Sequence, residues 1–261
     1  MIDSAPLLLV GTVLLALMMV AYESGMRLHR RLRSRADAPG NESSDESYAM
    51  SGVFGLLALL MAFAFGLALD RFEERRVLVV AEANAIGTFA SRLALAPAAA
   101  QAMLQRDLVR YAKARTVVGR TTDAARSQVA ANIADALHVR LGEQLMLTLA
   151  AGPGDSRTSL LVQAFDETGD TAAQRRAARA ARLPDLVLAL LALYCFAGAG
   201  MLGYTVAGSG ARHRIAAGVF FLLLSFAFVT ILDLDRPRGG AITVSQSELE
   251  RVTAQLTNET F

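Results

Sequence analysis

The sequence predicts an all-α membrane protein with four transmembrane helices and a soluble helical bundle inserted between spans two and three. Hydrophobic residues make up 54% of the 261 residues, more than an ordinary soluble domain contains. Four apolar stretches approach the roughly 20 residues that a helix needs to cross a bilayer. Between the second and third stretches the chain is charged, repeats its apolar residues with a helical period and lacks the alternation typical of strands.

The first apolar stretch has two interpretations, a retained helix or a cleaved signal peptide. A signal peptide needs basic residues before its apolar core. Here Asp3 precedes the core, and five arginines follow it from Arg27 onward. We therefore expect a retained helix with its N-terminus outside. The four expected spans are residues 5–22, 49–69, 186–206 and 215–232.

The spans divide the chain into five parts, and the bundle is joined to a membrane helix at both of its ends. Residues 1–48 hold the first span and a polar linker at 36–47, and residues 49–69 form the second span. Residues 70–185 form the extramembrane four-helix bundle, residues 186–234 hold the third and fourth spans, and residues 235–261 form a polar C-terminal tail.

One long helix is expected to join span two to the bundle. The uncharged run 52–69 passes directly into the charged segment 70–76, and no proline interrupts the chain before Pro97. Helices should follow over residues 98–118, from an N-cap within 121–123 to about residue 151, and from 156 to 182, the last weakened near Gly169. The middle one carries an apolar residue every four positions, at Val129, Ile133, Leu137, Leu141 and Leu145.

The arginines bear on membrane orientation. Lys113 is the only lysine, which together with the high alanine content indicates a GC-rich bacterial source. With the N-terminus outside, seven arginines lie in the short inside loops, against nine on the flanks of the bundle and in the tail. Because the positive-inside rule holds for short loops and long domains cross largely regardless of charge, we expect an inner-membrane protein with a periplasmic bundle.

Several classes of function lack support in the sequence. The single Cys195 excludes an internal disulfide, and the three histidines have no metal-ligand spacing, so we expect neither a metal nor a cofactor. A net charge of +2 gives no case for nucleic acid. We find no Ser-His-Asp signature or phosphate loop and expect no enzyme. Gly198, Gly200 and Gly203 match a dinucleotide motif, but inside an apolar span small residues favour helix packing.

Charged residues at the span ends and aromatic residues of span two are candidates for a pore. If Asp70, Asp233 and Asp235 lie at one membrane face, their carboxylates would attract cations at a pore mouth. They could instead fix helix depth and pair locally, for example Asp233 with Arg236. The aromatic rings could form a hydrophobic constriction, or contact lipid and other helices. The candidate set is Phe63, Phe65, Asp70, Arg71, Glu82, Asn84, Asp233, Asp235 and Arg236.

Glu82 and Asn84 lie among apolar residues of the long helix. A buried carboxylate there needs a partner. Glu82 could hold an ion, or it could pair with an arginine of a neighbouring helix such as Arg110 or Arg115. The spans themselves carry almost no charge, which argues against a transporter with a proton relay at the bilayer midplane.

Four segments carry a resemblance to a known family. They are Asp-Arg-Phe-Glu-Glu-Arg-Arg at 70–76, Glu-Ala-Asn-Ala-Ile-Gly-Thr at 82–88, Gly203-Tyr204 before an arginine-rich turn, and Asp-Leu-Asp-Arg-Pro-Arg-Gly at 233–239. With these segments the chain resembles the bacterial bestrophin-like membrane proteins over most of its length. The family name implies distant kinship to bestrophins, which are pentameric anion channels with four spans and a large helical domain in the cytosol.

The resemblance implies an oligomeric channel but places the helical domain on the opposite side of the membrane from the arginine distribution, and both orientations stay open. We expect a homo-oligomeric ion channel or pore in the lipid bilayer, with inorganic ions as cargo and a pentamer by analogy alone. The alternative is a membrane-anchored sensor or scaffold whose bundle binds a partner.

Overall fold

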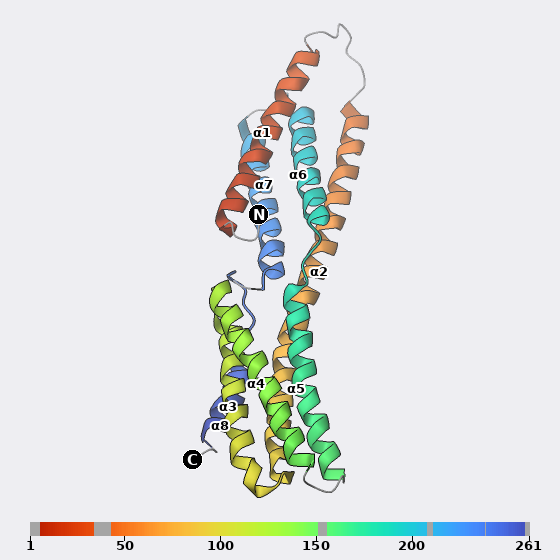
Figure 1. Ribbon diagram of the computed structural model, residues 1–261. Helices are drawn as coiled ribbons and strands as arrows, with labels where there is room; N and C mark the ends of the chain where they lie inside the picture. The colour runs from red at the N-terminus through yellow and green to blue at the C-terminus, as the bar shows by residue number, and fades with distance from the viewer. Residues whose placement is uncertain (1–5, 34–42, 151–155, 208–210, 238, 259–261) are drawn as a thin grey trace. The chain divides into compact units, whose positions relative to one another are not determined.

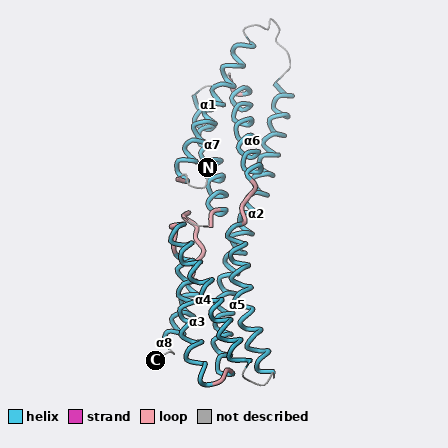
Figure 2. The backbone as a smooth tube through the Cα atoms, viewed as in Figure 1, coloured by secondary structure: helices cyan, strands magenta, loops and turns pink. Residues whose placement is uncertain are grey.

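The computed structural model describes residues 6–33, 43–150, 156–207, 211–237 and 239–258. Within these residues every regular element is a helix, as Figure 2 shows, which confirms the expected all-α class. The chain forms two compact units. Unit 1 comprises residues 1–71, 182–236 and 240–242, and unit 2 comprises residues 72–181, 237–239 and 243–261.

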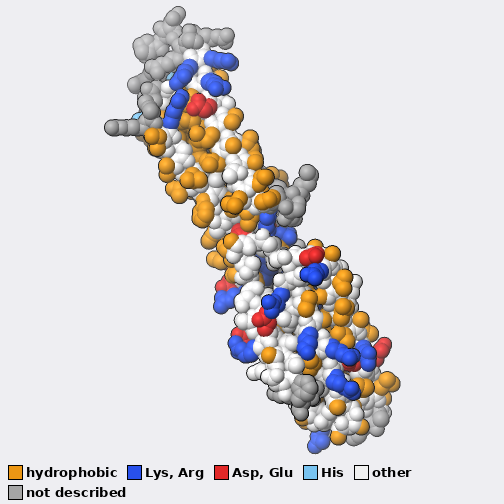
Figure 3. All heavy atoms as spheres, turned by 90° about the vertical axis from the view of Figure 1, so that its left-hand side faces the viewer, with side chains coloured by type: hydrophobic (Ala, Val, Ile, Leu, Met, Phe, Trp, Pro, Cys, Tyr) orange, Lys and Arg blue, Asp and Glu red, His pale blue; other side chains and the backbone are white. Residues whose placement is uncertain are grey.

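Unit 1 contains the apolar helices. They are α1 (Leu7–Arg33), the first part of α2 (Ser43–Arg92), α6 (Asp185–Thr205) and α7 (Ala211–Asp235), shown in Figure 1. Four described helical stretches, which overlap these helices, are long and apolar enough to cross a membrane. The face of these helices visible in Figure 3 is largely hydrophobic. The chain is therefore a multi-pass membrane protein, as the sequence predicts.

The helices extend beyond the apolar stretches that reveal them in the sequence. Residues 43–47, expected in the linker, form the beginning of α2, while residues 34–42 lie outside the described part of the chain. The helix of span four begins at Ala211 and ends at Asp235, beyond the expected 215–232. The reason is that backbone hydrogen bonding continues into polar residues, whereas hydropathy marks only the part that suits hydrocarbon.

Glycines allow α1 and α6 to approach closely in unit 1. A Cβ atom at Gly203 would overlap the backbone of Tyr22, and one at Gly25 would overlap the carbonyl of Gly200. The two helix backbones therefore touch where side chains are missing, which is the geometry of small-residue packing in membranes. This confirms the packing interpretation of the glycine motif, because Gly203 lies against the backbone of α1 and Gly198 lies against the Phe54 ring of α2.

Unit 2 is a helical bundle with one more helix than the sequence predicts. It holds the second part of α2, a short 3₁₀ turn (Leu93–Leu95), α3 (Ala98–Arg120), α4 (Ala124–Ala150), α5 (Ser156–Ala180) and α8 (Ser247–Asn258) (Figure 1). The additional helix, α8, comes from the tail, and its Leu249 and Leu256 are buried in the core of the bundle. Only one narrow face of α8 is apolar, so the composition of the tail is polar and did not indicate a helix packed into the bundle.

Most bundle boundaries follow the sequence. α2 continues without a break from span two to Arg92, so the expected long helix is confirmed. The Asp123 carboxylate accepts the backbone N–H of Ala125 at 2.8 Å, which confirms the N-cap of α4. The expected break after α4 lies at residues 151–155, outside the described part of the chain.

One expectation for the bundle is wrong. α5 is continuous through Gly169, where a Cβ would lie 2.9 Å from the His138 ring, so this glycine permits close packing instead of weakening the helix. The apolar residues that recur every four positions in α4 differ in exposure. Val129 and Ile133 are 59% and 51% exposed, whereas Leu145 is fully buried. The reason is that four residues advance a helix by about 400°, so a four-residue repeat drifts about 40° per step.

Candidate functional site

Glu82 lies at the centre of a buried ion cluster in unit 2. The side chain is fully buried, and its two carboxylate oxygens accept hydrogen bonds from Arg115 Nε of α3 and Arg175 Nη1 of α5. Arg175 Nη2 also donates to the side-chain oxygen of Gln246, just before α8. The cluster therefore ties α2, α3 and α5 to the tail, and the expected pairing of Glu82 with Arg115 is confirmed.

The two arginines keep Glu82 ionised. Burial by itself raises the pKa of a carboxyl group, but the charges and hydrogen bonds of Arg115 and Arg175 outweigh it and hold the pKa of Glu82 below its usual value. Both guanidinium groups are themselves almost fully buried, at 3% and 1% side-chain exposure. Two buried cations against one carboxylate leave an excess of positive charge within this cluster.

The sequence did not reveal Arg175 as a partner of Glu82, and of the two alternatives, Arg110 and Arg115, only Arg115 binds it. Arg110 binds Asp107 at 3.5 Å, and Arg140 binds the same carboxylate at 3.0 Å. The burial of Arg175 could have been predicted from the helical period, because small and apolar residues recur every three or four positions on the same face of α5. These residues are Leu161, Ala164, Thr168 and Ala172.

The carboxylates at the end of α7 bind backbone groups in unit 1. Asp233 and Asp235 are both 5% exposed. Asp233 accepts the N–H groups of Ala241 and Ile242, each at 3.0 Å, and Asp235 accepts the N–H of Leu183 at 2.8 Å. Buried acceptors that satisfy backbone donors favour the structural interpretation of these two acids.

The basic residues beside these carboxylates are only partly exposed. Arg71 Nη1 lies 4.0 Å from Asp235, with 24% of its side chain exposed, and Arg236 is of intermediate exposure. Within the described residues, no group of three or more His, Cys, Asp or Glu side chains is placed to hold a metal ion.

Phe63 and Phe65 of α2 are 64% and 42% exposed in unit 1. Two residues advance a helix by about 200°, so these rings lie on nearly opposite sides of α2 and cannot face one axis together. Asp70 is exposed and follows Phe63 by seven residues, which returns it to almost the same side. Asn84, in unit 2, is exposed and not among the buried apolar residues of the bundle.

The family model described as Bestrophin-like domain matches residues 8–249. The chain belongs to the bestrophin-like family. A solved mutant of a bacterial bestrophin homolog from Klebsiella pneumoniae is similar to it over 98% of each chain, with a TM-score of 0.72 and 15% identity. A second mutant of that homolog has a TM-score of 0.67 and 16% identity, over 95% of this chain and 98% of the other.

A further solved structure, described as a membrane protein, has a TM-score of 0.70 and 15% identity, over 95% of this chain and 98% of its own. No curated protein sequence is significantly similar to the chain. At these identities the likeness establishes the bestrophin fold over nearly the whole chain.

Proposed function

We propose that this bestrophin-like chain is a homo-oligomeric ion channel of the bacterial inner membrane, with α2 lining the central axis. The observation that carries the proposal is the outward side of α2, where Phe63 is 64% exposed and Asp70 follows it on the same side. A ring of phenylalanines could gate by dewetting, and a ring of carboxylates would attract cations. Membership of the bestrophin-like family supports a channel.

Glycines on α2 support assembly around that helix. A Cβ at Gly52, Gly55 or Gly66 would meet nothing within 4 Å in the described chain. Glycine inside a helix lowers the stability by about 0.5–1 kcal/mol relative to alanine. Three glycines with free space beside them would therefore be unfavourable unless another helix packs there. Close packing of a helix from a second copy would make these glycines favourable. The number of copies, five, is taken by analogy with bestrophins.

We further propose that unit 2 lies outside the membrane, on the periplasmic side that the short arginine-rich loops favour. The face of the bundle in Figure 3 carries many charged side chains, which supports an aqueous location. Lys113, the only lysine, is exposed on α3, so its chemical labelling shows on which side of the membrane the bundle lies. A membrane-impermeant amine reagent should label Lys113 in spheroplasts, with Lys113→Arg as the control. Labelling that requires lysed cells would place the bundle in the cytosol.

Ion flux in liposomes tests the channel. Reconstituted oligomers should conduct, and Phe63→Ala should raise the flux severalfold because it removes the apolar barrier. Phe65→Ala is the matched control, since the same ring is removed from the other side of α2. Folded oligomers without any flux would exclude the proposal, and an equal effect of the two substitutions would exclude Phe63 as the constriction.

The alternative of a sensor or scaffold is favoured by one observation on α4. Val129, Ile133 and Leu147 are exposed there, at 59%, 51% and 75%. Exposed apolar side chains on one helix indicate a contact surface. If this surface binds another protein, Ile133→Glu should remove that protein from the purified full-length chain and leave assembly intact. If it joins copies of the chain, the same substitution should weaken the oligomer.

A further inference from the structure

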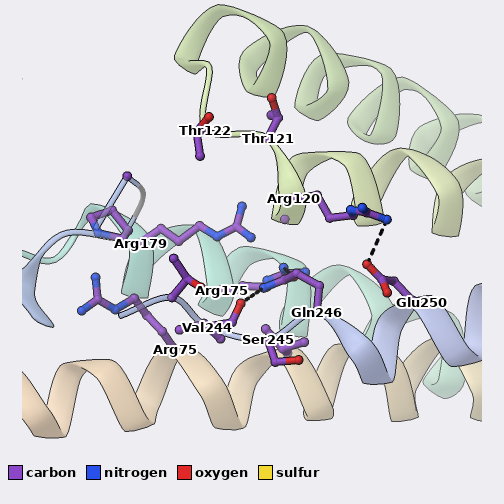
Figure 4. A pocket seen from close by; sticks show the side chains of 15 residues that line it. Arg75, Arg120, Thr121, Thr122, Arg175, Arg179, Val244, Ser245, Gln246 and Glu250 are labelled. Atoms are coloured by element: carbon purple, nitrogen blue, oxygen red, sulfur yellow. Dashed lines mark hydrogen bonds and ion pairs between the residues drawn. The ribbon is translucent and has the colours of Figure 1, made fainter. Parts of the chain in front are cut away.

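A basic pocket opens in unit 2 beside the Glu82 cluster. Its volume is about 300 Å³, and all the residues that line it belong to unit 2. Figure 4 shows its side chains converging from α2, the end of α3, α5 and the segment before α8. This size is at the lower end of small-molecule sites.

Positive charge dominates the lining. Arg75, Arg120, Arg175 and Arg179 line the pocket, and Glu250 is the only carboxylate among the lining residues. Glu250 lies 3.3 Å from Arg120, so it offsets the charge of one arginine at the rim. Even with the neighbouring Glu82 included, arginines outnumber carboxylates around the pocket, and a site of this kind attracts anions.

One buried donor at this pocket has no partner. Arg175 has 1% of its side chain exposed, and its Nη1 and Nη2 atoms are bonded to Glu82 and Gln246. Its Nε atom is buried and makes no hydrogen bond. A buried N–H of a guanidinium group normally has an acceptor, because leaving it unsatisfied costs about 1–3 kcal/mol or more. The unsatisfied donor in a residue that lines the pocket points to a missing acceptor.

Hydroxyl groups extend the set of donors. Thr121 and Thr122 also line the pocket with hydroxyl groups, whereas the Ser245 hydroxyl at the pocket donates to Ser247 Oγ at 3.1 Å. Guanidinium groups and hydroxyls together suit a tetrahedral oxyanion, since the planar guanidinium forms two parallel hydrogen bonds with phosphate.

We propose that this pocket binds a small phosphate-bearing anion, held by Arg175, Arg179 and Arg75 with hydroxyl donors from Thr121 and its neighbours. The anion would join α2, α3 and α5 to the tail, because each of these segments contributes a lining residue. The site is independent of the proposed conduction path, and its test measures binding instead of flux.

Calorimetric titration of the full-length protein in a phosphate-free maltoside detergent tests this site. Inorganic phosphate and pyrophosphate are the soluble probes, short-chain phosphatidylglycerol is the lipid probe, and potassium chloride at matched ionic strength is the reference. We expect one phosphate group bound per chain. Saturation by the soluble probes identifies a free phosphate ligand, and saturation by the lipid alone identifies a headgroup. No saturation by any probe, or an equal response to chloride, would overturn the proposal.

Substitutions then locate the bound anion. Arg179→Gln should weaken binding at least tenfold, whereas Arg176→Gln should change it less than twofold, because Arg176 is exposed on the same helix and pairs with Asp135. Thr121→Val removes a lining hydroxyl with little change of shape and should weaken binding severalfold. If Arg179→Gln does not fold, the affinity of Thr121→Val tests the site. Unchanged affinity in that variant would place the anion elsewhere and refute the site.

Discussion

Glu82 of α2 and Arg175 of α5 form an ion pair in the core of the bundle although 93 residues separate them in the sequence. Neither side chain reaches solvent, and Arg115 completes the group from α3. Because α2 is also the helix of span two, this cluster ties α3 and α5 to a helix that continues into unit 1.

Glu82→Gln should strongly destabilise the bundle. It removes the carboxylate that pairs with both Arg115 and Arg175, and an uncompensated buried charge costs about 3–5 kcal/mol. Thermal unfolding followed by circular dichroism measures the loss. Arg176→Gln breaks the exposed pair with Asp135 and should cost less than about 1 kcal/mol. Similar losses in the two variants would show that the cluster is not a main source of stability.

Gly203→Ala should disrupt the packing of α1 on α6. The added Cβ would overlap the backbone of Tyr22, and overpacking of this kind costs about 1–3 kcal/mol. Gly218→Ala on α7 is the matched control, since a Cβ there meets nothing within 4 Å. It should leave stability unchanged or raise it by up to about 1 kcal/mol. The melting temperatures of the two variants in detergent provide the comparison.

Asp233 and Asp235 should protect different amides. Asp233→Ala should accelerate hydrogen exchange at Ala241 and Ile242, whose N–H groups the carboxylate accepts. Asp235→Ala should accelerate exchange at Leu183. Each variant is the control for the other, and mass spectrometry of the peptides resolves the two regions. Faster exchange at all three amides in both variants would indicate general loosening.

The bundle should lose stability in mild acid through His138. This ring stacks on Phe165 with a centroid distance of 4.4 Å, and its Nε2 lies 3.1 Å from the Thr168 hydroxyl. Burial lowers the pKa of His138 below the ordinary value of about 6.5 for histidine. As pH falls below about 6.5, the unfolded chain therefore binds a proton that the folded chain does not, and stability decreases.

His138→Gln should flatten this pH dependence between pH 7 and 5, because the amide does not titrate in this range. His213→Gln should leave the dependence unchanged, since His213 is exposed on α7. Chemical unfolding at several pH values measures both. A wild-type stability that stays constant over this range would contradict the assignment.

The pairing of Glu82 with Arg115 could be predicted, because it required only the apolar pattern within one helix and an arginine on the next one. A carboxylate among Val79, Ala83 and Ile86 must find a cation, and Arg115 was available on the next helix. Arg175 and Gln246 were not predicted, because long-range pairing depends on which helix faces meet. The opposite sides of Phe63 and Phe65 on α2, by contrast, follow from the helical period of one segment and needed no tertiary structure.

The sequence by itself determined the helical class, the four apolar spans and the continuity of α2, since each depends on hydropathy and on the absence of a helix breaker within one segment. The tertiary structure decided the packing of α8 into the bundle, the backbone N–H groups bound by Asp233 and Asp235, and the arginine-lined pocket. These features unite residues far apart in the chain, and only the packing of the helices brings their side chains within contact distance.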